Sequence, residues 1–372
     1  MTTWSPPTMD HAARRAALVN LFSHHSIDAL LVTNLENVRY LTGFTGDSTY
    51  LLLTNHGDAT LLTDRRYETQ IAEECGELDA NIRGPGKLMP ALVRETLQPL
   101  SDKRLGFEAD DLSFAVAKCF QTNNESISWT ATSGMTAELR MIKDAGEIEI
   151  LRRAVWVAQQ SFQATTSQLR PGWTERQIAH ALEQSMRDLG AKGSGFDAII
   201  AMGANAALPH ATPGTQTLDD NPVLLIDWGA NLHGYTSDLT RTLHRDGADP
   251  QFESAYQAVL DGQMAAIRMM GPGVKLSDVD AAARDVIDSA GYGDAFSHGL
   301  GHGIGLQVHE SPRMAGTSEG TLQAGMVVTV EPGVYFAGRF GIRIEDDVLI
   351  TQDGCESLSN LPKTLADSHY QL

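Results

Sequence analysis

Two apolar, strand-like runs of this chain each lead directly into a carboxylate, and this feature restricts its possible folds more than any other. The run "VLLI" leads into Asp227 and "MVVTV" into Glu331, and a second acid, Asp238 or Glu345, follows each in the expected partner strand. Burying a carboxylate without a partner is costly, so these acids need cations or protons. Solvent exposure or an ion pair could explain one such acid, but it explains two similar strand pairs poorly. We therefore expect the four acids to meet at one site.

The stretch "SHGLGHGIGLQVHESPR" adds three histidines, His298, His302 and His309, on a glycine-rich segment. Glycine at this density favours neither a helix nor a strand. Four carboxylates and one imidazole suit a pair of divalent cations, of which Mn2+ fits best while Co2+ or Zn2+ can compete. Paired cations activate water, so the pattern indicates metal-assisted hydrolysis.

The strand that carries Glu345 contains three further charged residues. Arg343 precedes Glu345 by two positions and is expected on the same strand face, where it could orient Glu345 or contact a ligand. Alternation places Asp347 on that face and Asp346 on the opposite one, and neither is expected to be a metal ligand.

The remainder of the chain indicates two domains. Residues up to about Thr132 alternate short apolar strands with helical stretches, which is typical of a small α/β domain. Asp144 and Glu147 resemble a capping box that opens a long helix running to about Leu169. Two later segments then repeat a pattern of Pro-Gly turn and amphipathic helix, the first behind Thr174 and Gln177 and the second behind Ser277 and Asp280. Each helix pair precedes a strand pair, so we expect two similar halves.

Composition excludes several classes of function. The net charge of -19 disfavours nucleic acid or an anionic membrane as a partner. The three cysteines lie far apart in the sequence and form no C-x-x-C motif, so we expect them to be reduced thiols. No apolar run is long enough to span a membrane and the N-terminus has no signal-peptide pattern, so a cytoplasmic protein is expected.

Together the motifs "IDWGA…YTSDLTRT", "GLGHGIGL…VHE", "VEPGVY" and "GIRIEDDVL" resemble the five-ligand signature of the pita-bread metallopeptidases. The earlier stretch "NVRYLTGFTGDSTYLLLT" is similar to the creatinase-type N-terminal domain of aminopeptidase P and prolidase. The resemblance implies an α/β creatinase-like domain over residues 1–135 and an α+β catalytic pita-bread domain with a pseudo-twofold repeat over residues 136–372. It also implies a homodimer or homotetramer.

The resemblance also assigns roles to individual residues. Asp227 would hold one metal ion, His302 and Glu331 the other, and Asp238 and Glu345 would bridge both. Glu331 would shuttle protons. Trp228 departs from the small or aliphatic residue expected after the first aspartate, and it would narrow the nearby pocket. The catalytic or substrate-contacting set would be Glu331, His210, His298 and His309, and Arg343 joins it because of its place on the strand of Glu345.

The resemblance implies a peptidase that cleaves between an N-terminal residue and proline, with proline-containing peptides as substrates. Either an Xaa-Pro aminopeptidase or an Xaa-Pro dipeptidase fits. Arg313 would favour the dipeptidase by binding a C-terminal carboxylate, although it could equally be a surface residue paired with Glu310. Two alternatives share the fold: a creatinase-like amidine hydrolase without metal, and a non-catalytic peptide-binding module. The intact ligand set argues against both.

Overall fold

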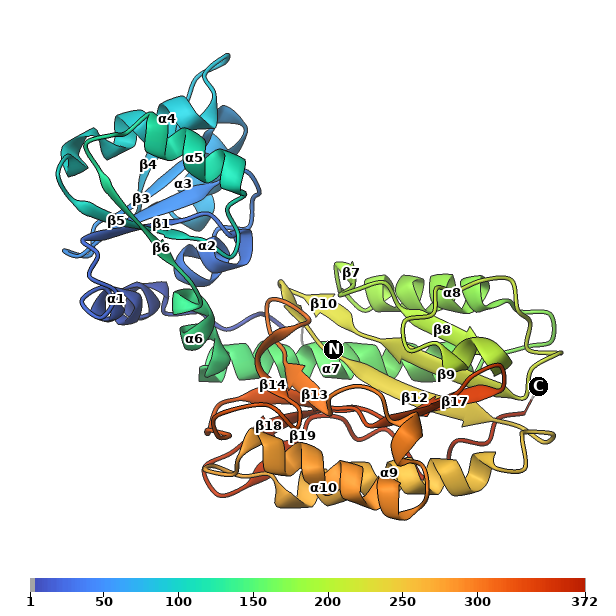
Figure 1. The fold of residues 1–372 in the computed structure, drawn as a ribbon. Coiled ribbons are helices and arrows are strands. Elements are labelled where there is room, and N and C mark those ends of the chain that lie inside the picture. The colour runs from blue at the N-terminus through green and yellow to red at the C-terminus, as the bar shows by residue number, and fades with distance from the viewer. Residues whose placement is uncertain (1–3, 372) are drawn as a thin grey trace. The chain divides into compact units, whose positions relative to one another are not determined.

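The computed structural model describes residues 4–371, which divide into two units (Figure 1). Residues 8–140 form the N-terminal unit. Residues 141–371, joined by residues 4–7, form the C-terminal unit, which contains all the predicted ligands.

The N-terminal unit contains a six-stranded mixed sheet in the order β4-β3-β2-β1-β5-β6. Its strands are β1 (Ala29–Val32), β2 (Tyr50–Thr54), β3 (Ala59–Asp64), β4 (Asp79–Arg83), β5 (Arg104–Glu108) and β6 (Ser128–Thr132). β1 and β2 pair antiparallel, whereas β1 and β5 pair parallel. Strands β1, β2 and β3 are mostly apolar, as the sequence predicted for this part of the chain, whereas the edge strands β4 and β6 are largely polar and gave no such signal.

Six helices accompany this sheet: α1 (His11–Leu21), α2 (Leu35–Thr42), α3 (Glu68–Glu74), α4 (Met89–Leu97), α5 (Phe114–Thr122) and α6 (Met135–Met141). The last of them crosses the boundary between the two units. The observed alternation of helices and strands confirms the α/β class predicted for this part of the chain.

The C-terminal unit contains the two predicted helix pairs. They are α7 (Ala145–Thr166) with α8 (Glu175–Asp188), and α9 (Phe252–Met269) with α10 (Leu276–Ser289). The capping box predicted at Asp144 is present, and Thr174, behind which the second helix was predicted, forms another. In each, the N-cap side chain accepts a hydrogen bond from a backbone amide that the helix leaves unpaired.

The start of α10 differs from the prediction, which placed this helix behind Ser277. This helix begins at Leu276, before Ser277, and its N-cap residue Lys275 makes no side-chain capping bond. The Asp280 carboxylate instead pairs with Arg284 and accepts the backbone amide of Leu300 at 3.0 Å. An acid three positions after a serine resembles a capping box, but the tertiary contacts of Asp280 determine its role.

The first half of the C-terminal unit contains short strands in two three-stranded sheets. Their orders are β11-β10-β7 and β12-β9-β8. The strands are β7 (Gly193–Ser194), β8 (Ile199–Met202), β9 (Val223–Trp228), β10 (Ala230–Leu232), β11 (Tyr235–Thr236) and β12 (Leu239–His244).

The strands of the second half differ from the prediction, which was a single strand pair. β13 (Gly301–Gly303), β14 (Glu310–Met314), β15 (Val327–Val330), β18 (Asp346–Ile350) and β19 (Cys355–Ser357) form one sheet, and β16 (Gly333–Phe336) with β17 (Phe340–Arg343) form another. The expected hairpin therefore divides into an inner pair, β16–β17, and an outer pair, β15–β18. The breaks fall at Glu331 and Glu345, two predicted ligands.

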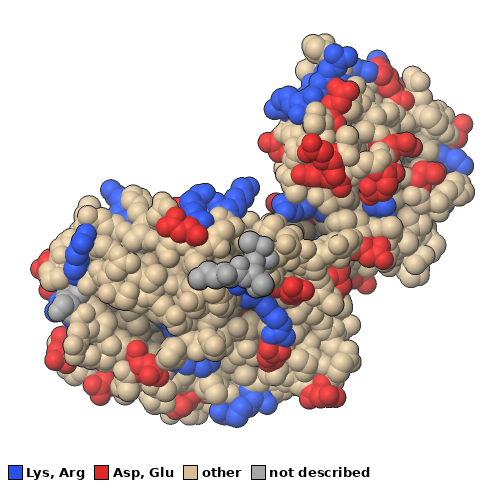
Figure 2. Space-filling model, turned by 180° about the vertical axis from the view of Figure 1, so that it is seen from behind, with Lys and Arg blue, Asp and Glu red and all other residues tan. Residues whose placement is uncertain are grey.

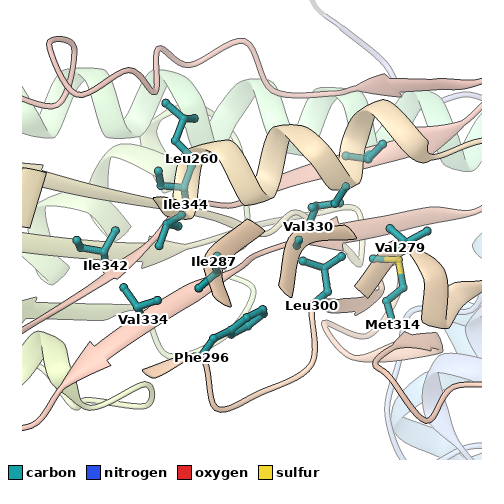
Figure 3. Packing of buried hydrophobic residues seen from close by; sticks show 14 of the residues in the cluster. Leu260, Val279, Ile287, Phe296, Leu300, Met314, Val330, Val334, Ile342 and Ile344 are labelled. Carbon is teal, nitrogen blue, oxygen red and sulfur yellow. The ribbon is translucent and has the colours of Figure 1, made fainter. Parts of the chain in front are cut away.

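Each helix pair has its own apolar core. Side chains of α7 and α8 pack with β8 and β9, and those of α9 and α10 pack with β15 to β18. Figure 3 shows part of the second core, in which Val330 and Ile344 lie among residues that include Leu260 and Ile287. The prediction of two similar halves, each a helix pair packed on strands, is thus confirmed.

No helix within the described residues is long and apolar enough to cross a membrane. On the face shown in Figure 2, both units carry Lys and Arg side chains as well as Asp and Glu. The excess of acid in the sequence therefore does not make this face uniformly acidic.

Candidate metal centre

Asp227 and Asp238 come from the first half. Asp227 lies in β9 and Asp238 directly before β12, and Thr240 of β12 is paired with Asp227 in the ladder. The next residue, Trp228, points the other way, because side chains alternate along a strand. It is fully buried, stacks on Phe162 with ring centroids 4.5 Å apart and donates its indole N–H to Ala158. The prediction that Trp228 narrows the pocket was wrong.

Glu331 and Glu345 come from the second half. Each directly follows a residue whose side chain is fully buried in the core, Val330 and Ile344 respectively. The buried amide of Gln263, on α9, donates to the carbonyl oxygens of both, at 3.1 and 3.2 Å. One side chain therefore holds the backbone just before both glutamates.

His302 lies on β13, between two glycines that allow strands to pass close by. A Cβ added to Gly301 would lie 2.1 Å from the Thr329 carbonyl oxygen, and one added to Gly303 would lie 2.1 Å from that of Ser311. The glycines thus permit tight strand packing around His302. Its Nδ1 lies 3.0 Å from the Gly303 carbonyl oxygen, which can only accept, so Nδ1 carries the hydrogen and Nε2 is left to bind.

These side chains converge. Asp238, His302 and Glu345 offer ligand atoms that all lie within 4.8 Å of one another. His302 Nε2 lies 3.2 Å from Glu331 Oε1 and 3.8 Å from Asp238 Oδ2. Within the described residues, Oδ1 of Asp227, Oδ1 of Asp238 and Oε1 of Glu345 are buried and lack a hydrogen-bond partner. Buried oxygens without donors beside a free imidazole nitrogen are what a divalent cation requires, so the residues fit such an ion.

The electrostatics agree with this interpretation. Burial, and then the charges of Glu345 and Asp227, raise the pKa of Asp238 well above its usual value. Burial, with the charges of Glu331 and Asp227, does the same to the pKa of Glu345. Burial alone would raise the pKa of Glu331, but the neighbouring His302 lowers it below its usual value. Carboxylates that repel one another so strongly are suited to a shared cation.

Arg343 contacts Asp227 rather than Glu345. Its guanidinium pairs with Asp227 Oδ2 at 2.5 Å, and its Nε donates to the Thr240 hydroxyl at 3.2 Å. That hydroxyl in turn donates to Glu345 Oε2 at 2.6 Å. Arg343 therefore orients Asp227 directly and Glu345 through Thr240, and it leaves one Asp227 oxygen available. The sequence contained no signal for Thr240.

The predicted alternation of the two aspartates after Glu345 is confirmed. Asp346 lies on the opposite face of the strand from Glu345 and pairs with Arg241 and Lys363 at 2.7 and 2.6 Å. Asp347 lies on the side of Glu345, where it accepts the backbone amide of Asp238 at 3.0 Å, and burial raises its pKa to about 8.

His298 belongs to a chain of hydrogen bonds that leads to Asp227. Its Nδ1 faces the Gly299 carbonyl oxygen at 2.8 Å and must carry the hydrogen, and burial lowers its pKa, so the ring is neutral and Nε2 accepts. The Tyr335 hydroxyl, 3.0 Å from Nε2, must then donate to it and accept from Arg343 at 2.8 Å. Tyr335 was not predicted, because one tyrosine in "VEPGVYF" carries no chemical signal.

The other predicted residues lie around this cluster. The His309 ring is 4.4 Å from that of His302, and burial followed by the charge of His302 lowers its pKa. His210 is exposed and follows Pro209, whose carbonyl accepts from Arg343 at 3.4 Å. Arg313 is exposed on β14, opposite His302 in the ladder.

The raised carboxyl pKa values predict how the stability of the protein depends on pH. An unfolded aspartate has a pKa of about 3.9, so the folded chain retains the Asp347 proton up to about pH 8 whereas the unfolded chain has lost it. Stability without metal must therefore fall as the pH rises through this range. Adding Mn2+ to metal-free protein should raise Tm at least about 3 °C more at about pH 8.5 than at about pH 5.5, measured by calorimetry. A larger increase at the acidic pH would contradict this account.

A two-unit chain whose second unit gathers carboxylates and an imidazole at the junction of two similar halves has the architecture of a metal-dependent exopeptidase. The chain belongs to metallopeptidase family M24, whose pattern matches residues 149–352. Residues 14–142 match the creatinase/prolidase N-terminal domain. The predicted pita-bread fold and the predicted family are both confirmed. This family depends on a dinuclear metal centre.

Similar proteins extend over nearly the whole chain. The uncharacterized peptidase YqhT of Bacillus subtilis is 36% identical over 94% of this chain and 98% of its own. The Xaa-Pro dipeptidase from Bacillus anthracis is 34% identical, with a TM-score of 0.90 over 96% of this chain and 99% of its own. The X-Pro aminopeptidase from Thermotoga maritima is also 34% identical, with a TM-score of 0.85 over 94% of this chain and 98% of its own.

Proposed function

We propose that this protein hydrolyses the peptide bond between an N-terminal residue and proline, at a centre held by Asp227, Asp238, His302, Glu331 and Glu345. The carrying observation is the set of buried carboxylate oxygens without donors around the free Nε2 of His302. A pair of divalent cations, when bound there, would make water nucleophilic near neutral pH and polarise the substrate carbonyl. We propose Mn2+ as the native metal.

The residues around this centre would bind the substrate and move its protons. Glu331, whose Oε1 lies 3.2 Å from His302 Nε2, would take the proton from the attacking water and give it to the leaving nitrogen. His309 would donate to the oxyanion that forms, and exposed His210 would contact the substrate near the scissile bond. His298 and Arg343 would act through Tyr335 and Asp227, by orientation rather than by contact with the substrate.

A panel of Xaa-Pro dipeptides and Xaa-Pro-Yaa tripeptides, assayed with Mn2+, Co2+ and Zn2+, tests the activity. Elemental analysis of the purified protein separates the alternatives: a metal-free active protein would favour creatinase-like chemistry, and a metal-free inert one a binding module. We further propose that the protein is cytoplasmic and forms a homodimer or homotetramer. Light scattering of the purified protein tests the oligomeric state.

Arg313 favours the dipeptidase over the aminopeptidase. Glu310, the acid that could have paired with it, instead pairs with Lys143 at 3.1 Å. Within residues 4–371, Arg313 makes no ion pair, and its place in the ladder is opposite His302. An unpaired guanidinium beside the centre is suited to the C-terminal carboxylate of a dipeptide, which a tripeptide presents as an amide.

Arg313→Ala should therefore raise KM for Xaa-Pro dipeptides and spare tripeptides. A charge-assisted contact contributes about 1.5–3 kcal/mol, so the ratio of the two kcat/KM values should shift by about 10- to 100-fold. Arg268→Ala, at an exposed arginine on α9, is the control and should leave the ratio unchanged. Equal losses on both substrates, or none, would favour the aminopeptidase.

A further inference from the structure

Lys143 and Glu310 form a buried ion pair that the proposed mechanism does not use. Lys143 Nζ lies 3.1 Å from Glu310 Oε2, and the two side chains are 1% and 5% exposed. Lys143 directly precedes the N-cap of α7, and its backbone amide is fixed by the Gly325 carbonyl at 2.8 Å. Burying two charges costs solvation that a good pair only about recovers, so the ion pair is not explained by stability alone.

Glu310 directly follows the segment 304–309, here called the His309 loop. Residues 305–309 of this loop form neither helix nor strand. Glu310 Oε1 accepts the backbone amide of Gln307 at 3.0 Å, so its carboxylate closes the loop while its other oxygen binds Lys143. The fit is tight, because a Cβ added to Gly305 would lie 2.8 Å from Glu310 Oε2.

The His309 ring has little else to fix its position. Within the described residues its imidazole makes no hydrogen bond, and its ring contact is with His302 at 4.4 Å. Its placement therefore depends on the backbone of the loop. A shift of about 1 Å in a catalytic group can cost about 10²-fold in rate, so whatever holds this loop affects the reaction.

We propose that Lys143 is a positioning residue, which acts through Glu310 to hold His309 where it can donate to the developing oxyanion. This inference rests on the role proposed above for His309. It assigns the segment just before α7 a part in catalysis, although no atom of that segment is proposed to contact the substrate.

The test is a double-mutant cycle with metal-loaded enzyme. Lys143→Met should lower kcat by about 10- to 100-fold, change KM less than about 3-fold and leave the metal content unaltered. In a His309→Ala background the same substitution should change kcat less than about 2-fold, because there is no imidazole left to misplace. A general structural role would instead lower kcat by the same factor in both backgrounds, and that result would overturn the proposal.

Hydrogen exchange supplies a readout that does not depend on activity. The backbone amide of Gln307 should exchange at least about 10-fold faster in Lys143→Met, because its acceptor Glu310 loses the ion pair with Lys143. Unchanged protection would overturn the proposal. Arg152→Met, on α7, breaks an exposed ion pair with Glu356 of β19. It is the matched control and should alter neither kcat nor the exchange of the Gln307 backbone amide.

Two outcomes separate this inference from the proposed function. Wild-type enzyme that cleaves no Xaa-Pro substrate would overturn the function, while the exchange measurement would still decide whether Lys143 holds the loop. If Lys143→Met does not fold, Lys143→Met/Glu310→Gln leaves no charge buried alone and retains an acceptor for Gln307. That double variant should show the same loss of kcat, and wild-type kcat would overturn the proposal.

Discussion

Asp238→Ala should reduce hydrolysis of Xaa-Pro substrates by at least about 10³-fold without unfolding the chain. Asp238 is one of three residues whose ligand atoms converge within 4.8 Å, so its loss removes a carboxylate from the centre of the cluster. Its pKa is raised by burial and by its acidic neighbours, which means that its charge is unfavourable in the metal-free fold. The metal-free variant should therefore have a Tm no lower than that of the metal-free parent.

The measurements are kcat/KM in metal-supplemented buffer, metal content and Tm. Asp285→Ala removes an exposed carboxylate on α10 and serves as the control, which should keep full activity. Near wild-type hydrolysis by Asp238→Ala would mean that the cluster is not the metal centre.

His309→Ala should lower kcat by about 10²-fold or more while the metal content stays intact. The ring lies beside His302, outside the group whose ligand atoms converge, so its loss removes a donor to the transition state rather than a ligand.

The comparison of kcat with metal content tests this division of roles. His56→Ala, at an exposed histidine of the N-terminal unit, should change neither quantity. If the metal content of His309→Ala fell together with kcat, His309 would itself be a ligand, and the ligand set proposed here would be wrong.

The acids of the centre could be predicted because a carboxylate at the end of an apolar strand conflicts with its surroundings. Asp227 and Glu331 follow "VLLI" and "MVVTV", and that conflict can be recognised from the sequence alone. The N-terminal ends of the helices at Asp144 and Thr174 could be predicted for a similar reason, because a capping box involves residues only three positions apart.

The parts that could not be predicted depend on contacts between distant segments. Thr240 and Tyr335 matter because each lies between two charged or titratable groups, and neither residue type signals this in the sequence. Trp228 was assigned to the pocket because it neighbours Asp227, although strand alternation directs it into the core. Sequence proximity to a ligand is therefore a weaker guide than the face of the strand.

The bridge between Thr240 and Glu345 has a consequence for how long the folded state persists. Glu345 donates its backbone amide to the Thr240 carbonyl at 3.1 Å, across a sequence separation of 105 residues, and this contact joins the two halves beside the ligands. An ion held by acids from both halves would act there as a reversible crosslink, closing a long loop as a disulfide does. Because this crosslink lies within the fold, its rate of release would limit how fast the two halves separate. Resistance to proteolysis would then depend on metal occupancy, with the concentration of free metal in the medium setting the lifetime of the enzyme.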